Sequence, residues 1–234
     1  MKTIGLIGGM SWESSLEYYR IVNETVKQKL GGLRSAKCLM YSVDFAEIEA
    51  LMRQDRWDDI AQLMIDAARR LERGGADLVV LCSNTMHKSA DEIQSRIRVP
   101  LLHIADATAE KIKAAGLRKI GLLGTRFTME HDFYTGRLVD RFGLDVIIPN
   151  SEDREMIHRV IFDELCLGII KPESRDAYIR VMDNLVRQGA EGIILGCTEI
   201  ESLVRAEDSR VLLFPTAKIH AIAAVEYALA QKEI

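Results

Sequence analysis

Several features that mark other classes of protein are missing from this sequence of 234 residues. There is no run of about 18 apolar residues, so no membrane-spanning helix is predicted. The cysteines at positions 38, 82, 166 and 197 lack the Cys-x-x-Cys spacing of a metal or redox site, and we expect no bound metal. The net charge of −4 comes without a basic cluster, which argues against a nucleic-acid partner.

The N-terminal sequence Met-Lys-Thr-Ile-Gly-Leu-Ile-Gly-Gly-Met lacks the length and cleavage site of a signal peptide. We therefore predict a cytoplasmic protein whose thiols stay reduced. Its glycines are also out of the Gly-x-Gly-x-x-Gly register of a dinucleotide-binding turn. No nucleotide cofactor is predicted.

The chain contains an internal repeat. The segment Gly75–Thr85, with the sequence GADLVVLCSNT, returns 114 residues later as Gly189–Glu199, with the sequence GAEGIILGCTE. A second pair, Ile4–Gly8 and Ile120–Gly124, agrees at an offset of 116 residues. Half of the chain therefore resembles the other half. Two similar halves that face each other across a cleft could present one reactive group to each face of a small molecule.

Ser83 and Cys197 occupy equivalent positions in the two repeats. Cys197 follows an apolar run and is succeeded by Thr198 and Glu199, an abrupt change to polar residues. Helix N-termini and loop amides at such a place would favour the thiolate of Cys197. The alternative is a small buried residue that only packs. The other repeat carries a polar cluster, Ser83-Asn84-Thr85, at the equivalent place, and this favours a functional role for Cys197.

Strand and helix patterns alternate along the whole chain, so we predict an α/β fold with parallel sheets and right-handed crossovers. Short apolar runs predict buried strands at Thr3–Ile7, Lys37–Ser42, Leu78–Cys82, Leu101–Ile104, Lys119–Leu123, Asp145–Ile148, Gly192–Leu195 and Val211–Phe214. Amphipathic stretches predict helices at Ser11 to about Leu30, Trp57–Arg73, His87–Ile97, Asp106–Ala115, Phe133–Phe142, Asp153–Leu167, Glu173–Gln188 and Thr216–Gln231.

The loop after the first strand of each half is a further candidate for substrate contact. Gly8-Gly9 permits close backbone approach, and amides at the helix start near Ser11 could hold a carboxylate. The equivalent loop, residues 124–128, offers hydroxyls and a cation. Ordinary strand-to-helix turns, with no role in binding, are the alternative.

Two further residues near Ser83 carry predictions. His87 is either a proton relay or a structural imidazole. The side chain of Cys82 is expected to point away from the direction of Ser83 and to pack in the core.

Four motifs together resemble the aspartate/glutamate racemases, enzymes that use neither pyridoxal phosphate nor metal: Gly8–Ser14 (GGMSWES), Asn84–His87 (NTMH), Leu123–Thr125 (LGT) and Gly196–Glu199 (GCTE). The resemblance implies two similar α/β domains related by a pseudo-twofold axis, with the active site in the cleft between them. It also implies that the C-terminal helix returns to the first domain. We therefore expect domains at residues 1–99 plus 212–234 and at residues 100–211, in a homodimer.

The resemblance also implies the catalytic residues. The family uses two cysteines on opposite faces of the α-carbon of an amino acid. The second falls on Cys197 and the first falls on Ser83, a hydroxyl residue that the broad-specificity branch with the Met-Ser-Trp-Glu-Ser loop tolerates. The substrate-binding residues implied are Met10, Asn84, Thr85, Thr125, Thr198 and Glu199, with Arg53 and Lys171 as the nearest replacements for the basic residues that grip a side-chain carboxylate.

Cysteine ionises near pH 8.5, whereas an aliphatic hydroxyl does not ionise near neutral pH. Cys197 is therefore the expected base, and the resemblance implies that the second cysteine acts on the L enantiomer. We predict that Cys197 removes the α-proton of an L-amino acid and that Ser83 donates or relays the returning proton. Two alternatives stay open. One is a single-cysteine relative, such as a decarboxylase or a cis-trans isomerase of a small dicarboxylate. The other is a non-catalytic sensor of small carboxylates.

Overall fold

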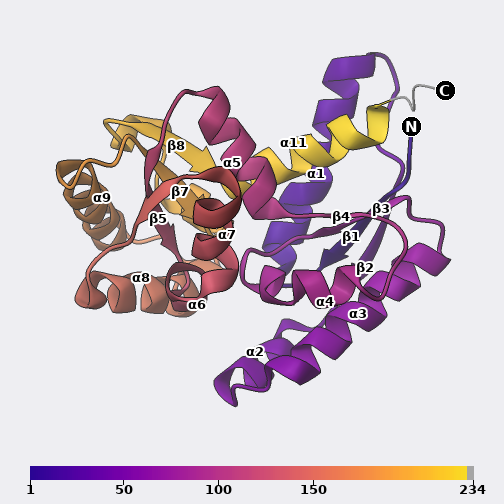
Figure 1. Ribbon diagram of the computed structural model, residues 1–234, viewed down its shortest axis with the longest axis horizontal. Coiled ribbons are helices and arrows are strands. Elements are labelled where there is room, and N and C mark those ends of the chain that lie inside the picture. The colour runs from indigo at the N-terminus through magenta and orange to yellow at the C-terminus, as the bar shows by residue number, and fades with distance from the viewer. Residues whose placement is uncertain (231–234) are drawn as a thin grey trace. The chain divides into compact units, whose positions relative to one another are not determined.

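The computed structural model describes residues 1–230, and the chain divides into two compact units (Figure 1). One unit comprises Met1–His103 and the chain from His220 onward, and the other comprises Ile104–Ile219. Both boundaries lie later in the sequence than predicted. The physical reason is strand pairing, because residues 101–102 pair within the first sheet and residues 212–215 pair within the second.

The first unit is built around a four-stranded parallel sheet in the order β2-β1-β3-β4. Its strands are β1 (Ile4–Gly8), β2 (Cys38–Ser42), β3 (Leu78–Leu81) and β4 (Leu101–Leu102). Its helices are α1 (Trp12–Leu30), α2 (Phe45–Arg53), α3 (Trp57–Arg73), η1 (Thr85–Ser89) and α4 (Ala90–Gln94). Every residue of β1 and β3 is buried, as expected for central strands of a parallel sheet.

The second unit repeats this topology in a parallel sheet of order β6-β5-β7-β8. Its strands are β5 (Lys119–Gly124), β6 (Asp145–Ile147), β7 (Gly192–Gly196) and β8 (Leu212–Pro215). Its helices are α5 (Ile104–Ala114), α6 (Arg126–Glu130), α7 (Asp132–Phe142), α8 (Ser151–Asp163), η2 (Leu165–Leu167), α9 (Pro172–Arg187), α10 (Ile200–Leu203) and η3 (Ala206–Asp208). The duplication seen in the sequence is therefore a duplication of the sheet, with β1 and β3 equivalent to β5 and β7.

The predicted α/β class and all eight predicted strands are confirmed. Three short helices, α2, α6 and α10, were not predicted. One predicted helix, His87–Ile97, is instead the 3₁₀ turn η1 followed by the five-residue helix α4. Short helices depend on caps and tertiary contacts more than on their own propensity, which explains these differences.

The C-terminal helix α11 (Thr216–Leu229) packs on the first unit from His220 onward. The amide of Lys2 donates a hydrogen bond to the Ala228 carbonyl at 2.9 Å, and Lys29 pairs with Glu226 at 3.0 Å. These contacts place the helix where the sequence predicted it. Gln231, the predicted last residue of the helix, lies outside the described residues. Within residues 1–230 no helix has the length and apolar character needed to cross a membrane.

Candidate active site

Four predicted site residues lie at the carboxyl edge of the first sheet: Met10, Ser83, Asn84 and Thr85. The strands β1 and β3 are neighbours, and the Cys82 amide donates a hydrogen bond to the Ile7 carbonyl at 2.9 Å. The loop after β1 and the segment after β3 therefore leave the sheet side by side. All four residues are buried.

The loop after β1 is held in shape by hydrogen bonds within the Gly8–Ser15 segment. Ser11 caps α1 by accepting from the Ser14 amide, and the Gly9 amide donates to Ser15 Oγ at 2.7 Å. The Ser15 hydroxyl in turn donates to the Ser11 carbonyl at 3.0 Å. These bonds fix the course of the chain next to the segment that carries Ser83.

Gly9 has a φ of +92°, and a Cβ there would collide with the Val43 carbonyl. We expect Gly9→Ala to lower the free energy of unfolding through both effects. Gly75→Ala is the matched control, since Gly75 has a φ of +95° but no atom within 4 Å of an added Cβ. Chemical denaturation should show Gly9→Ala to be the less stable variant by about 1 to 3 kcal/mol, the usual range for overpacking. Equal losses in the two variants would contradict a steric role for this site.

At the carboxyl edge of the second sheet, Cys197 lies beside Thr125. The strands β5 and β7 pair Gly124 with Gly196, so the two following residues leave neighbouring strands. Thr125 is buried and caps α6 by accepting from the Thr128 amide. The hydroxyl of Thr216, the first residue of α11, donates to the Leu195 carbonyl at 2.9 Å.

The thiol of Cys197 donates a hydrogen bond to Glu199 Oε2 at 2.9 Å. The Thr198 hydroxyl donates to the same oxygen at 2.6 Å, so one carboxylate oxygen accepts from two consecutive side chains. Both Cys197 and Glu199 are buried. The arrangement holds the sulfur in a defined position and places a negative charge beside it, a contact that spacing in the sequence did not predict.

The main-chain amide of Glu199 favours the Cys197 thiolate, as expected of a local amide, but two larger effects outweigh it. Burial raises the pKa of the Cys197 thiol well above its ordinary value, and the adjacent Glu199 carboxylate raises it further. The only helix that follows Cys197 directly is α10, which spans four residues and cannot offset these effects. The resting site therefore holds a protonated thiol.

Tyr178 and Cys166 also lie close enough to Cys197 to interact with it electrostatically. Burial raises the pKa of the Tyr178 phenol, and Cys197, Glu164 and Cys166 raise it further. The Tyr178 hydroxyl donates to the Ile157 carbonyl at 3.1 Å. No sequence pattern distinguishes Tyr178, because a tyrosine on the buried side of an amphipathic helix carries no signal beyond core packing.

Arg53 and Lys171, the two basic residues predicted to bind the side-chain carboxylate of a substrate, each form an ion pair with a glutamate of their own unit. Arg53 is the last residue of α2; its side chain is 79% exposed and pairs with Glu49 one turn earlier. Lys171 precedes α9 and pairs with Glu164 at 3.0 Å. The Ser174 hydroxyl and Lys171 both hold the pKa of the Glu164 carboxyl below its ordinary value. Neither base is brought beside Ser83 or Cys197 by a described contact within its unit.

Cys82 is fully buried, and burial raises the pKa of its thiol. Its neighbour Ser83 retains a small exposed fraction, 8%. Both residues lie just beyond the end of β3, so the opposite direction of their side chains stays a prediction.

Comparison with known proteins extends these observations to the whole chain. The family model described as Asp/Glu/Hydantoin racemase matches residues 7–231. The broad specificity amino-acid racemase RacX of Bacillus subtilis (strain 168) is 27% identical over 150 residues, which make up 63% of this chain and 63% of RacX. The alignment therefore spans slightly less than two thirds of that relative.

Two solved structures are more similar and cover nearly the full chain. A Yersinia pestis protein described as a candidate Asp/Glu racemase is 57% identical with a TM-score of 0.93, over 98% of this chain and 100% of that one. The aspartate racemase homologue PH1733 of Pyrococcus horikoshii OT3 is 37% identical with a TM-score of 0.85, over the same shares of the two chains. The resemblance predicted from the four motifs is confirmed, and the chain belongs to the Asp/Glu/Hydantoin racemase family.

Proposed function

We propose that this protein is an amino-acid racemase that works without a cofactor, by removing the α-proton and returning a proton to the opposite face. Family membership supports the reaction class, and the similarity to RacX supports use of several amino acids. The observation that carries the proposal is the Cys197 thiol bonded to a buried carboxylate, at the position that the duplication makes equivalent to Ser83. Acidic amino acids are the first substrates to test, followed by neutral ones.

In this proposal Cys197 is the base for the L-amino acid and Glu199 is the group that attracts its ammonium. The positive charge of the substrate offsets the carboxylate and lowers the pKa of the thiol, because an opposite charge nearby favours the ionised form. The thiol then loses its proton to solvent. The thiolate takes the α-proton and becomes a thiol again, leaving a carbanion at the α-carbon.

Ser83 then supplies a proton to the opposite face of the carbanion, from its hydroxyl or through a water molecule that it holds. Ser83 is then reprotonated from solvent, which replaces the proton that Cys197 first released. Cys197 is again the resting thiol, so the cycle balances. An aliphatic hydroxyl is a poorer acid than a thiol, and general acid–base catalysis is typically worth about 10² to 10⁴-fold in rate. The Ser83 face should therefore limit inversion without preventing it.

The unequal pair makes a prediction that proton NMR in D₂O can test. The equilibrium constant for racemisation is one, so kcat/KM must be equal in the two directions despite the difference between the residues. The asymmetry appears instead in isotope exchange: an L-amino acid should lose its α-proton faster than it inverts. A screen of the chiral protein amino acids in their L form that shows no α-proton exchange in any of them would overturn the proposed function.

Removing the negative charge of Glu199 should shift the ionisation of Cys197. The carboxylate raises the pKa of this thiol, so Glu199→Gln should lower that pKa and produce thiolate at lower pH. The rate of alkylation by iodoacetamide, measured against pH, reports the thiolate. Its midpoint should lie above the ordinary range of a thiol in the wild type and move to lower pH in Glu199→Gln. The exposed Glu207→Gln is the control, and an unmoved midpoint in Glu199→Gln would show that the carboxylate does not set the pKa.

A single-cysteine reaction is the second candidate, because only one of the two equivalent positions carries a thiol. Cys197 would then protonate a carbanion from one face, as in a decarboxylase or a cis-trans isomerase of a small dicarboxylate. A panel of malonate-type and maleate substrates distinguishes it from the racemase. The homodimer and the cytoplasmic location that we expect from the sequence stay predictions.

A further inference from the structure

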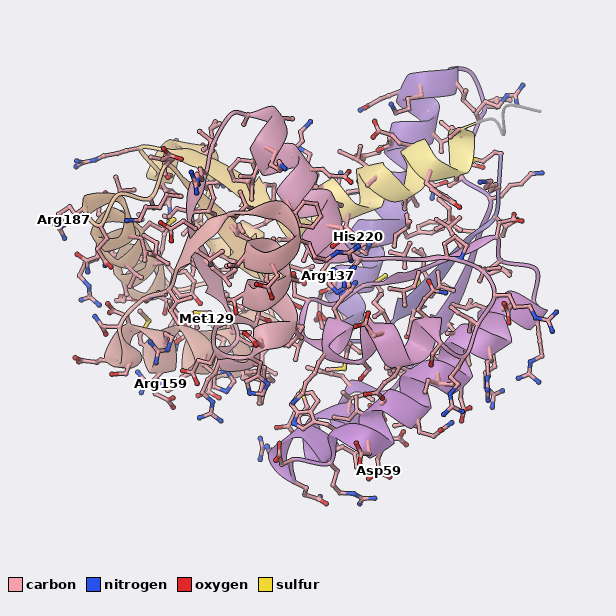
Figure 2. The ribbon with its side chains drawn as sticks, viewed as in Figure 1. Asp59, Met129, Arg137, Arg159, Arg187 and His220 are labelled. Atoms are coloured by element: carbon pink, nitrogen blue, oxygen red, sulfur yellow. The ribbon has the colours of Figure 1, made fainter. Side chains whose placement is uncertain are left out.

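The first unit contains a buried cluster of three histidines and one tyrosine that the proposed chemistry does not use. His87 lies on η1, His103 follows β4, His220 lies on α11 (Figure 2) and Tyr18 lies on α1. All four are buried. The ring centroids of His87 and His103 are 4.6 Å apart, and those of His87 and His220 are 5.5 Å apart. The cluster therefore ties three helical segments to the end of β4.

The hydrogen bonds of the cluster assign its protons. A carbonyl oxygen only accepts, so His220 Nε2, 2.9 Å from the Leu102 carbonyl, carries a hydrogen. The other ring nitrogen of His220 then accepts from the Tyr18 hydroxyl at 2.9 Å. Burial lowers the pKa of His220 to about 3, which keeps this imidazole neutral near neutral pH. His220 is thus a neutral ring that donates to β4 and accepts from α1.

His87 directs its own hydrogen bond at the residue proposed to donate the returning proton. His87 Nδ1 lies 2.7 Å from the Ser83 carbonyl and donates to it by the same reasoning. The main-chain amide of His87 donates to the Asn84 carbonyl at 3.1 Å. One residue therefore holds two consecutive carbonyls of the segment that leaves β3, and the direction of the Ser83 side chain depends on that segment.

The two halves of the duplication differ at this point. The position equivalent to His87 is Glu201, and in that half the reactive Cys197 is held through its side chain by Glu199. In the first half, Ser83 is instead held by the hydrogen bond from His87 to its main-chain carbonyl. This difference suits a hydroxyl that is a weak acid, since transfer of its proton depends strongly on geometry.

We propose that His87 is a positioning residue: its imidazole, packed against His103 and His220, fixes the main chain of Ser83 and thereby the direction of the Ser83 hydroxyl. The inference rests on the proposed function, because it assigns His87 to the Ser83 face of the reaction. It predicts that changes at His87 act on reprotonation by Ser83 and spare proton removal by Cys197.

The test compares His87→Leu with His87→Asn. Leucine removes the donor, whereas the side-chain amide of asparagine can place an N–H near the position of Nδ1. For an L-amino acid in D₂O, His87→Leu should slow inversion by about ten- to a hundredfold, a typical cost of misplacing a catalytic group. Its α-proton exchange should stay within about twofold of the wild type, because exchange needs only the Cys197 face. His87→Asn should recover most of the inversion.

Tyr18→Phe is the matched control, since it removes the hydroxyl that donates to His220 and leaves the His87 bond to Ser83 in place. It should lower the melting temperature while keeping the wild-type ratio of exchange to inversion. A parallel fall of exchange and inversion in His87→Leu, or an equal change of their ratio in Tyr18→Phe, would reduce His87 to a structural residue.

Crystal structures of the His87 variants separate this inference from the proposed function. Absence of exchange in the wild-type protein would remove the proposed function. The structures would still decide the inference, because the Ser83 carbonyl and hydroxyl should be displaced in His87→Leu and restored in His87→Asn. An unmoved Ser83 in His87→Leu would overturn it.

Discussion

Cys197→Ala should abolish both α-proton exchange and inversion of L-amino acids. The thiol is the only group at the carboxyl edge of β7 proposed to act as base, and alanine leaves no proton acceptor at that atom. The expected loss is at least about 10²-fold and up to about 10⁴-fold, the range typical of general acid–base groups. Proton NMR in D₂O follows exchange, and chiral chromatography follows inversion in the same samples.

Cys38→Ala is the control for the loss of a thiol. Cys38 lies at the start of β2, is half-buried, and has no role in the proposed reaction. This variant should exchange and invert its substrate within about twofold of the wild type, as expected for a position away from the reacting atoms. Exchange that persists in Cys197→Ala would place the base elsewhere and contradict the mechanism.

Ser83→Cys should accelerate inversion more than any other single substitution considered. A thiol is a far better proton donor than an aliphatic hydroxyl, because its ordinary pKa lies near 8.5. We expect inversion to rise by about tenfold or more, part of the range available to general acid–base catalysis. The rate of inversion should then approach the rate of exchange, which proton NMR and chiral chromatography measure together.

Two further variants at Ser83 separate proton donation from packing. Ser83→Thr keeps the hydroxyl and adds a methyl group, so it should not accelerate inversion. Ser83→Ala removes the hydroxyl, and it should retain exchange at the Cys197 face while losing most inversion. If Ser83→Cys folds normally and inverts its substrate no faster than the wild type, the role of Ser83 as the limiting proton donor is wrong.

The fold could be predicted in outline because its patterns are local. Each strand is a short apolar run between glycines, prolines or polar residues, and the long helices carry amphipathic periodicity. The helix α3 occupies the predicted range Trp57–Arg73 without change. The nine-residue α2 and the shorter α6 and α10 carry too few turns for such a pattern. The side chains of Asp44 and Thr125 cap α2 and α6.

The domain boundaries required information that no local pattern contains. The segment Leu101–Leu102 pairs with β3, and Leu212–Pro215 pairs with β7, so each of these short strands belongs to the unit opposite to the predicted one. An apolar run indicates a strand but not its neighbour. Strand order is decided by pairing across the sheet, which only the folded chain displays.

The duplicated sequence alone determined that Ser83 and Cys197 are equivalent and that a hydroxyl stands where its counterpart is a thiol, because residue identity and alignment need no coordinates. Tertiary structure decided what surrounds each of them. The Glu199 carboxylate and burial raise the pKa of Cys197, and a histidine drawn into a cluster with residues far along the chain holds the main chain of Ser83. Burial and through-space contacts set both properties. Neither the Cys197 pKa nor the placement of the Ser83 main chain is determined by neighbours in the sequence. For that reason the direction expected for the Cys197 pKa was wrong, although the sequence located Cys197 correctly at the end of its strand.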